Sequence, residues 1–558
     1  MEFVLNWGQM RPTEYSPRSN NPAPSQKSHT FHQRYRLWVD IVASEALKGV
    51  FGFENNMEWG RNSASRGSAQ LGQYGGGASG SRGVSLEVLH AYVDWLVPST
   101  DLRVRVGMQP VANPTYVENS QQVVSEHLAG IVLSYTPASA PVGVVAWWVR
   151  PYADNGSPYK TAPDNKANIT ASHRWNDIDA FGIALPMSFD GVKVAPWGMY
   201  AAIGRDAFTD YRTTSGFTTN AVDKNRDPAS ISGGTGGRTN FALGYLAGPW
   251  YPVLVGDKAT SAAKKGQGQA FWFGLTGELT MFNPFRLAWD FNYGSVDLGK
   301  VKDIDSKDLP VVGKDRSGTD IKFDPSGWKI LREGYILNLL AEYKLDFATP
   351  GIAYWYASGD KSKWEKGSGM MPALRPSSKM TSFGQETQSS WTYSNGAFSY
   401  SLAGTQGLML QMKDMTFAKD LKHNIRLAYY QGTNSASGVK KGWTGTSKPD
   451  ETTNYDFPYV FPNNGGGNPN VMYLTTKDTA YEVNVDTYYD IYKNLQLAIE
   501  LGYIKLNLSD SVWGKKAYKK SSQAKAGDLN GWGAGGKKFL NDTTQAMTKA
   551  TIGLRYTF

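Results

Sequence analysis

The residues of this chain that could perform catalysis do not form a catalytic pattern. Ser125, Glu126 and His127 are the residue types of a hydrolase triad, but adjacent side chains on an extended chain diverge, and no Gly-x-Ser-x-Gly turn occurs. The run from Gly294 to Lys300 has the spacing of a phosphate-binding loop. Val301 then replaces the hydroxyl residue that would bind magnesium, and the surrounding pattern predicts a strand with no helix after it. We therefore expect that the protein is not an enzyme.

Metal and cofactor sites are not expected either. The chain has no cysteine, which excludes thiolate ligands, disulfides and cysteine nucleophiles. His29 and His32 are three residues apart, but in an extended segment this spacing does not bring two imidazoles onto one metal ion. The six histidines are His29, His32, His90, His127, His173 and His423.

Charged side chains instead recur at every second position of extended segments. A strand places alternate side chains on opposite faces. One face of the segment 31–43 carries Arg34, Arg36, Trp38 and Asp40, and the other face is apolar. Arg103 and Arg105 alternate with apolar residues in the same way. A single such strand also fits a soluble sandwich, but the pattern repeats along the chain in segments of about ten residues, which is typical of a transmembrane barrel.

Composition supports strands and argues against membrane-spanning helices. Aromatic residues make up 13% of the 558 residues, with 31 Tyr and 18 Trp, and there are 60 Gly. The longest uncharged apolar stretch, 128–149, contains Pro137 and Pro141. Each proline would cost a helix about 3 kcal/mol, so this stretch predicts two strands joined by a turn.

The predicted fold class is all-β: one transmembrane antiparallel β-barrel domain over 1–558, with eighteen strands, or sixteen if two weak segments belong to loops. Short turns alternate with long Gly/Ser/Asn/Lys-rich loops, which predicts periplasmic turns and extracellular loops. Asn240 to Ala247 is strand-like but lies within the longest loop. The predicted strands are 2–10, 31–43, 46–58, 85–96, 102–109, 129–136, 143–150, 176–186, 192–204, 270–282, 285–295, 329–347, 351–360, 406–417, 422–431, 478–492, 495–508 and 543–558.

The net charge of +9 is spread along the chain. The densest basic cluster, 515–520, lies in a Ser/Gly-rich stretch typical of a solvated loop, and no nucleic-acid-binding module accompanies it. We do not expect nucleic acid as a partner. A positive field within a pore would favour anions.

The end of the chain carries a family resemblance. Ile552, Leu554, Tyr556 and Phe558 alternate with small or polar residues, and the terminal Tyr-x-Phe resembles the assembly signal of outer-membrane barrels. The segments HQRYRLWVDIVASEALKGVFGFE (32–54) and SLEVLHAYVDW (85–95) are similar to early strands of the major porins of sulfate-reducing bacteria, among the trimeric general porins. The resemblance covers the strands loosely and the long loops hardly at all.

This resemblance implies a homotrimeric outer-membrane porin for passive diffusion of small hydrophilic solutes and ions, with membrane lipid, lipopolysaccharide and the barrel-assembly machinery as partners. In such porins the loop after the fifth strand narrows the pore; here that loop is 110–128, with Glu118 and Glu126. These carboxylates would face Arg34, Arg36, Arg103 and Arg105, or they are simply solvated. The loop 60–84 would latch onto a neighbouring subunit, or stay free.

Other hypotheses remain from the sequence. A substrate-specific channel for sugars or anions would line its pore with aromatic side chains, as the inward position of Trp38 suggests. A barrel enzyme and a purely structural or adhesive surface protein are the remaining classes. A plugged, gated transporter is not expected, because the strand pattern begins at Glu2, and if the protein is exported the numbering starts near the mature N-terminus.

Overall fold

The computed structural model of the chain describes residues 2–10, 26–59, 86–118, 120–152, 177–204, 268–300, 311–314, 320–322, 326–378, 380–381, 401–438, 474–513 and 544–558. The loop 60–84, the strand-like segment 240–247 and the basic cluster 515–520 lie outside these ranges. Within the described ranges, no helix is both long enough and apolar enough to span a membrane.

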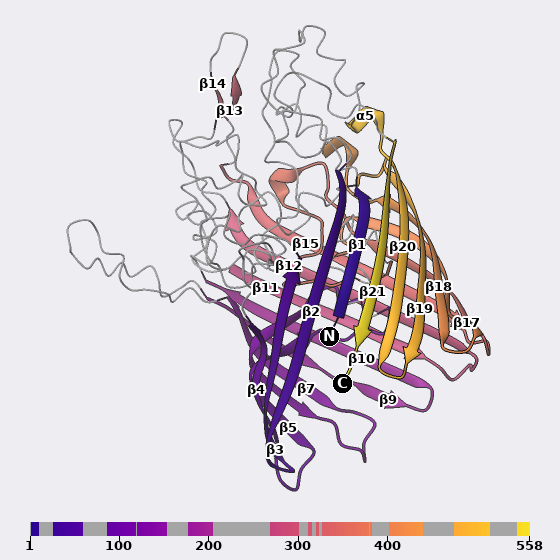
Figure 1. Cartoon of the computed structure of the whole chain (residues 1–558). Coiled ribbons are helices and arrows are strands. Elements are labelled where there is room, and N and C mark those ends of the chain that lie inside the picture. Colours follow the sequence, from indigo (N-terminus) through magenta and orange to yellow (C-terminus); the bar gives the residue numbers. More distant parts are fainter. Residues whose placement is uncertain are drawn as a thin grey trace, which may run out of the picture.

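Nearly all regular structure in these ranges is extended (Figure 1). The elements are β1 (Glu2–Met10), β2 (Gln26–Ser44), β3 (Leu47–Glu58), β4 (Glu87–Leu96), β5 (Leu102–Ala112), β6 (Ser125–Tyr135), β7 (Val144–Tyr152), β8 (Ile178–Ala184), β9 (Met187–Phe189), β10 (Val192–Ile203), β11 (Gly268–Leu279), β12 (Phe285–Lys300), β13 (Val311–Lys314), β14 (Asp320–Lys322), β15 (Lys329–Tyr343), β16 (Thr349–Ala357), the 3-10 helix η5 (Trp364–Lys366), β17 (Thr405–Ala418), β18 (Leu421–Gly432), β19 (Thr479–Tyr492), β20 (Leu495–Asn507), α5 (Asp510–Trp513) and β21 (Thr544–Tyr556).

The long strands form one closed antiparallel sheet. Each strand pairs with the next along the chain, and β1 pairs with both β2 and β21, which closes the ring and brings the two ends of the chain side by side (Figure 1). β8 and β9 both pair with β10, so they are two pieces of one span. The hairpin β13–β14 stands apart from the barrel. The described chain therefore makes the eighteen spans that alternation predicts, rather than sixteen.

Some predicted boundaries were wrong. The span predicted over 176–186 is interrupted after Ala184, where Pro186 has no backbone N–H to donate to a neighbouring strand. The strand predicted over 351–360 starts earlier, because Thr349 already begins β16. The backbone N–H of Leu345 donates to the carbonyl of Ala348 and closes the turn before it. The run 294–300 lies entirely within β12, so the phosphate-loop spacing is a coincidence of a strand sequence.

The outer face of the barrel is apolar and rich in aromatic residues. On β11, Phe271, Phe273 and Leu275 are 44–48% exposed, whereas Trp272 between them is 2% exposed and lies on the inner face. Aromatic rings contact one another across neighbouring strands, with centroids 5.3 Å apart for Phe273 and Tyr293. This surface suits lipid, and its aromatic groups resemble the girdles of membrane barrels.

The inner face holds the polar side chains and a second, smaller set of apolar ones. Buried polar residues on it include Asp290, Asn338 and Glu482. Buried apolar residues such as Trp272 and Trp355 belong to a cluster inside the barrel that also contains residues of two loops. The interior is thus partly filled by chain that folds inward.

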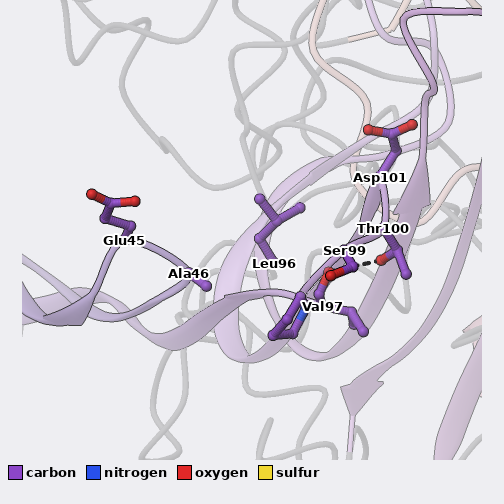
Figure 2. Close-up of a pocket in the computed structure, with 8 residues that line it drawn as sticks. Glu45, Ala46, Leu96, Val97, Ser99, Thr100 and Asp101 are labelled. Carbon is purple, nitrogen blue, oxygen red and sulfur yellow. Dashed lines mark hydrogen bonds between the residues drawn. The ribbon is translucent and has the colours of Figure 1, made fainter.

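The short turns lie along the lower rim of the barrel in Figure 1. The turn at Glu45–Ala46 lies beside the turn 97–101, and an open depression between them is lined by both (Figure 2). The backbone N–H of Leu96 donates to the carbonyl of Ala46, and the Thr100 hydroxyl donates to the carbonyl of Val97. These hydrogen bonds account for the compact shape of the turns.

Candidate functional site in the pore

The loop after the fifth strand contacts the inner face of β12. β5 extends to Ala112 and β6 begins at Ser125, so the loop itself is 113–124, shorter than the predicted 110–128. The Asp290 carboxylate on β12 accepts hydrogen bonds from the backbone N–H groups of Tyr116 (3.0 Å) and Val117 (3.3 Å) and from the hydroxyls of Thr115 and Thr276. One inward carboxylate therefore anchors the loop.

A second segment, 358–381, also folds inward and was not predicted. Trp272 Nε1 donates to the carbonyl of Pro372 (2.8 Å), and Arg332 Nε donates to that of Met370 (3.1 Å). Backbone hydrogen bonds then join this segment to the first loop, at Leu374 N to Val123 O and Ser377 N to Gln121 O. The apolar run Met370 to Leu374 within a polar stretch is the sequence signal that could have identified it.

Glu118 lies in a chain of alternating charges along the inner wall. Its Oε1 is 2.9 Å from Lys413 Nζ on β17, and Lys413 also contacts Glu342 on β15. Arg286 on β12 bridges Glu342 (2.7 Å) and Glu278 (2.9 Å). Lys193 on β10 ends the chain at Glu278 (2.9 Å).

The environment of Glu118 keeps it charged. Burial alone would raise the pKa of this carboxyl, but the Lys413 ammonium and hydrogen bonds from Gln411 and Lys413 outweigh burial and lower the pKa below its ordinary value. Its backbone has a φ of 49°, in the left-handed region that non-glycine residues adopt at a cost of about 1–3 kcal/mol.

Both predicted carboxylates, Glu118 of the loop and Glu126 at the start of β6, form ion pairs. Glu118 pairs with Lys413, and Glu126 Oε2 lies 3.2 Å from Arg375 Nε of the second inward segment. Each of these two carboxylates thus has a cation partner from another part of the chain, and the expectation that they face the four arginines of β2 and β5 stays a prediction. Their being simply solvated is wrong for Glu118, whose side chain is 8% exposed.

The four predicted arginines gather on one side of the pore, which we call the basic wall: Arg34, Arg36, Arg103 and Arg105. Arg34 and Arg36 share the Glu54 carboxylate of β3, with Nε–Oε2 distances of 3.5 and 2.6 Å.

Arg103 and Arg105 share Asp94 of β4, at 2.9 and 3.2 Å. The guanidinium of Arg105 also lies over the ring of Tyr92, 5.5 Å from its centroid. Two carboxylates thus form ion pairs with four guanidinium groups.

The catalytic residue types considered above have other roles in the structure. Glu126 binds Arg375, and His127 Nδ1 lies 3.0 Å from His90 Nε2. Within the described residues, no group of three or more His, Asp or Glu side chains could hold a metal ion.

The terminal aromatic residues lie on the outer face of the barrel. Tyr556 and Phe558 stack with ring centroids 6.1 Å apart, and Phe558 also stacks on Tyr35 of β2 at 6.4 Å. Their role as an assembly signal stays a prediction.

Comparison with known proteins gives similarity in overall shape only. No protein-family model matches the chain, and no curated protein matches it. Similar solved structures include OccAB1 of Acinetobacter baumannii, with a TM-score of 0.44, 10% identity and coverage of 100% of this chain and 96% of that one. OccAB2 of the same organism has a TM-score of 0.43, 9% identity and coverage of 100% of this chain and 97% of that one. The outer membrane protein OprD of Pseudomonas aeruginosa has a TM-score of 0.40, 10% identity and coverage of 100% of this chain and 92% of that one.

With TM-scores below 0.5, no property of these proteins is transferred to this chain. The assignment to a membrane rests on the barrel itself. Every described span pairs on both sides, so the wall has no open edge, and its outer face is apolar. A barrel of this form, with short turns at one rim, is how proteins span the bacterial outer membrane, and this protein is an outer-membrane β-barrel.

Proposed function

We propose that the protein is a selective outer-membrane channel through which small hydrophilic solutes diffuse passively, with a preference for anions. The proposal requires no catalytic group and no cofactor. It depends on the basic wall and on the two inward segments.

The observation that carries the preference for anions is the unequal exposure of the two signs of charge. The side chains of Arg36, Arg103 and Arg105 are 30%, 50% and 32% exposed. The carboxylates that they contact, Glu54 and Asp94, are only 5% and 4% exposed. A solute passing this wall meets guanidinium groups rather than carboxylates, and such a surface attracts anions.

The inward segments support a selective channel over a wide general pore. The loop 113–124 and the segment 358–381 are hydrogen-bonded to each other and to the wall, so both occupy part of the barrel interior. A constricted passage makes a solute contact the wall, which lets side chains discriminate. A homotrimer stays a prediction from the family resemblance.

The ion preference can be tested with purified protein in planar lipid bilayers under a KCl gradient. We expect a reversal potential that indicates preference for chloride, and a smaller preference at high ionic strength, because salt screens exposed charges. The variant R36Q/R103Q should move the reversal potential towards that of an unselective pore. Each buried carboxylate keeps one arginine in this variant, so the barrel should still fold.

A matched control is R150Q. Arg150 on β7 forms two hydrogen bonds with Asp179, at the outer face that also carries the exposed Phe181. Its removal should leave the ion preference unchanged. Cation preference in the wild type, or equal reversal potentials for the wild type and R36Q/R103Q, would overturn the anion proposal. Absence of any conductance would overturn the channel itself.

A further inference from the structure

Trp38 is a large aromatic side chain exposed within the pore. It lies on the inner face of β2, between Arg36 and Asp40 in the alternating pattern, and is 50% exposed. It pairs across the sheet with Gly52 of β3. A Cβ atom at Gly52 would lie 3.0 Å from Trp38 Nε1 and 3.1 Å from His90 Cβ, so the glycine leaves room for the indole to lie across the wall.

Two histidines hold this ring in place. Trp38 Nε1 donates to His90 Nδ1 at 3.1 Å, and His90 Nε2 lies 3.0 Å from His127 Nδ1. The imidazole rings of His90 and His127 have centroids 4.8 Å apart. The β4–β5 pairing ends at Ala91 and Met108, whereas the β5–β6 pairing continues to Ala112 and Ser125. His127 of β6 contacts His90 beyond the last β4–β5 pair.

The order of these atoms requires both histidines to be neutral. An indole N–H is only a donor, so His90 Nδ1 must be the acceptor. A neutral His90 then carries its proton on Nε2 and donates it to His127 Nδ1, which must also lack a proton. A second proton on His90 would remove the acceptor for Trp38. A second proton on His127 would place two N–H groups against each other and break the link to His90.

Trp38, His90 and His127 form a chain of hydrogen bonds that we call the relay. The charged and titratable groups around this relay already have partners. They are Arg36, Asp40, Glu54, Tyr92, Arg105 and Glu126. Arg36 pairs with Glu54, Asp40 with Lys48, and Glu126 with Arg375. Histidine changes charge between about pH 5 and 8, whereas these carboxylate pairs ordinarily remain ionised there. The histidines are therefore the groups of this cluster that titrate in that range.

We propose that Trp38 is a specificity-determining residue of the pore for anions with a flat aromatic face, and that His90 and His127 are positioning residues that hold its ring in place only while both are neutral. The inference rests on the proposed anion channel and goes beyond it. The exposed indole face offers stacking, and the neighbouring guanidinium of Arg36 offers charge. Protonation of the relay releases the ring and removes the stacking surface.

The test compares two sulfonates whose charge does not change with pH, benzenesulfonate and cyclohexanesulfonate, as blockers of the single-channel chloride current. At about pH 8 we expect benzenesulfonate to block at a roughly two- to tenfold lower concentration, as an aromatic pair would provide. In acid, at about pH 5 or below, the two concentrations should become equal, because one extra proton on either histidine breaks the chain of hydrogen bonds that holds the ring.

Three variants separate positioning from mere structure. The W38A channel should conduct chloride, and both sulfonates should block it at the same concentration at either pH. H90F removes the acceptor and should behave in the same way. H90N keeps an acceptor oxygen close to the position of Nδ1 and does not titrate, so it should restore the preference for benzenesulfonate at about pH 8 and keep it at about pH 5.

Each outcome decides the inference. Equal block of the wild type at about pH 8, or an H90N channel that still loses its preference in acid, would overturn it. Either result would leave the anion channel intact as long as chloride still passes. A protein with no chloride current would instead contradict the proposed function.

Discussion

At the scale of single residues, the pore is organised by carboxylates that take several donors each. Glu54 serves two arginines, and Asp290 receives hydrogen bonds from two backbone N–H groups. Glu118 accepts from Lys413 and Gln411. Hydrogen-bond donors around a buried carboxylate offset the cost of removing it from water. The energetic role of each residue is therefore set by its contacts in space.

Glu118 gives a pH-dependent prediction. Its pKa is lowered in the folded protein from an ordinary value of 4.5, so its ion pair stabilises the fold above that pH, and the stabilisation is lost as the pH falls through the folded-state pKa. E118Q should reduce the free energy of unfolding at neutral pH by about 1–3 kcal/mol and should flatten the loss of stability in acid. Unfolding in detergent, followed by tryptophan fluorescence at several pH values, measures both effects.

The matched double variant is E118Q/K413M. If the two side chains act as a pair, its loss of stability should be smaller than the sum of the two single losses. Strict additivity would show that the contact contributes nothing.

At the scale of elements, the inward segments depend on particular junctions in the wall. The loop 113–124 is held by hydrogen bonds to Asp290 of β12. The β5–β6 hairpin that carries this loop extends beyond the last pair of β4 and β5, Ala91 and Met108. Gly107 lies at that place and has a φ of 129°, a backbone conformation that side-chain-bearing residues rarely adopt.

Asp290→Ala should release the loop without opening the barrel. Removing a carboxylate that accepts several hydrogen bonds should cost on the order of 3 kcal/mol and should give a larger, noisier single-channel current. Circular dichroism should still show a strand spectrum. Asp101→Ala, in an exposed turn at the rim, is the control and should leave the current unchanged. A D290A current like that of the wild type would mean that other contacts hold the loop.

Gly107→Ala should destabilise the barrel strongly. A Cβ atom there would lie 2.2 Å from the carbonyl oxygen of Ala91, in addition to the backbone strain. Gly327→Ala is the matched control, because Gly327 also has a positive φ (79°) but open space around its Cβ position. We expect a cost of about 1–2 kcal/mol for the control from strain alone and a clearly larger cost for G107A. Equal costs in a denaturant titration would contradict the predicted clash.

At the scale of the whole molecule, the barrel wall faces two solvents, with lipid on its outer face and water on its inner face. Each strand satisfies its backbone hydrogen bonds with its neighbours, and the β1–β21 pairing leaves no edge in the described wall. The alternation of side chains then assigns one face to each solvent.

The outer face can be tested by placing a charge at two depths. Leu275→Arg, on the exposed outer face of β11, should cost about 2–4 kcal/mol when the barrel folds into lipid vesicles. Met281→Arg, on the turn after β11, should cost only about 0–1 kcal/mol because it lies near the interface. Folding titrations in urea with vesicles measure both. A reversed order would contradict the proposed position of the bilayer.

The terminal aromatic residues give a prediction about assembly. If Tyr556 and Phe558 form the recognition signal, Phe558→Ala should reduce the amount of barrel in the outer membrane of cells, while spontaneous folding into detergent should proceed as in the wild type. Heat-modifiable migration on gels measures the folded fraction in both cases. An equal loss in cells and in detergent would indicate a purely structural role for the stacking on Tyr35.

The sequence by itself predicted a barrel of eighteen spans, with sixteen as the alternative, and the face on which most side chains lie. Both follow from a local rule, the two-residue period of a strand, so Arg36 and Trp38 could be assigned to the inner face without knowledge of any partner. The inward loop after β5 was predicted by family resemblance.

Only the tertiary structure decided which charges meet. Glu118 and Lys413 are 295 positions apart, and Trp38 and His90 are 52 apart. Such contacts depend on how the ring closes, where β4 and β5 separate and how two loops share one interior, and no local pattern encodes these distances. The segment 358–381 was missed for the same reason, since its apolar residues are buried only by a wall that exists once all the strands have paired.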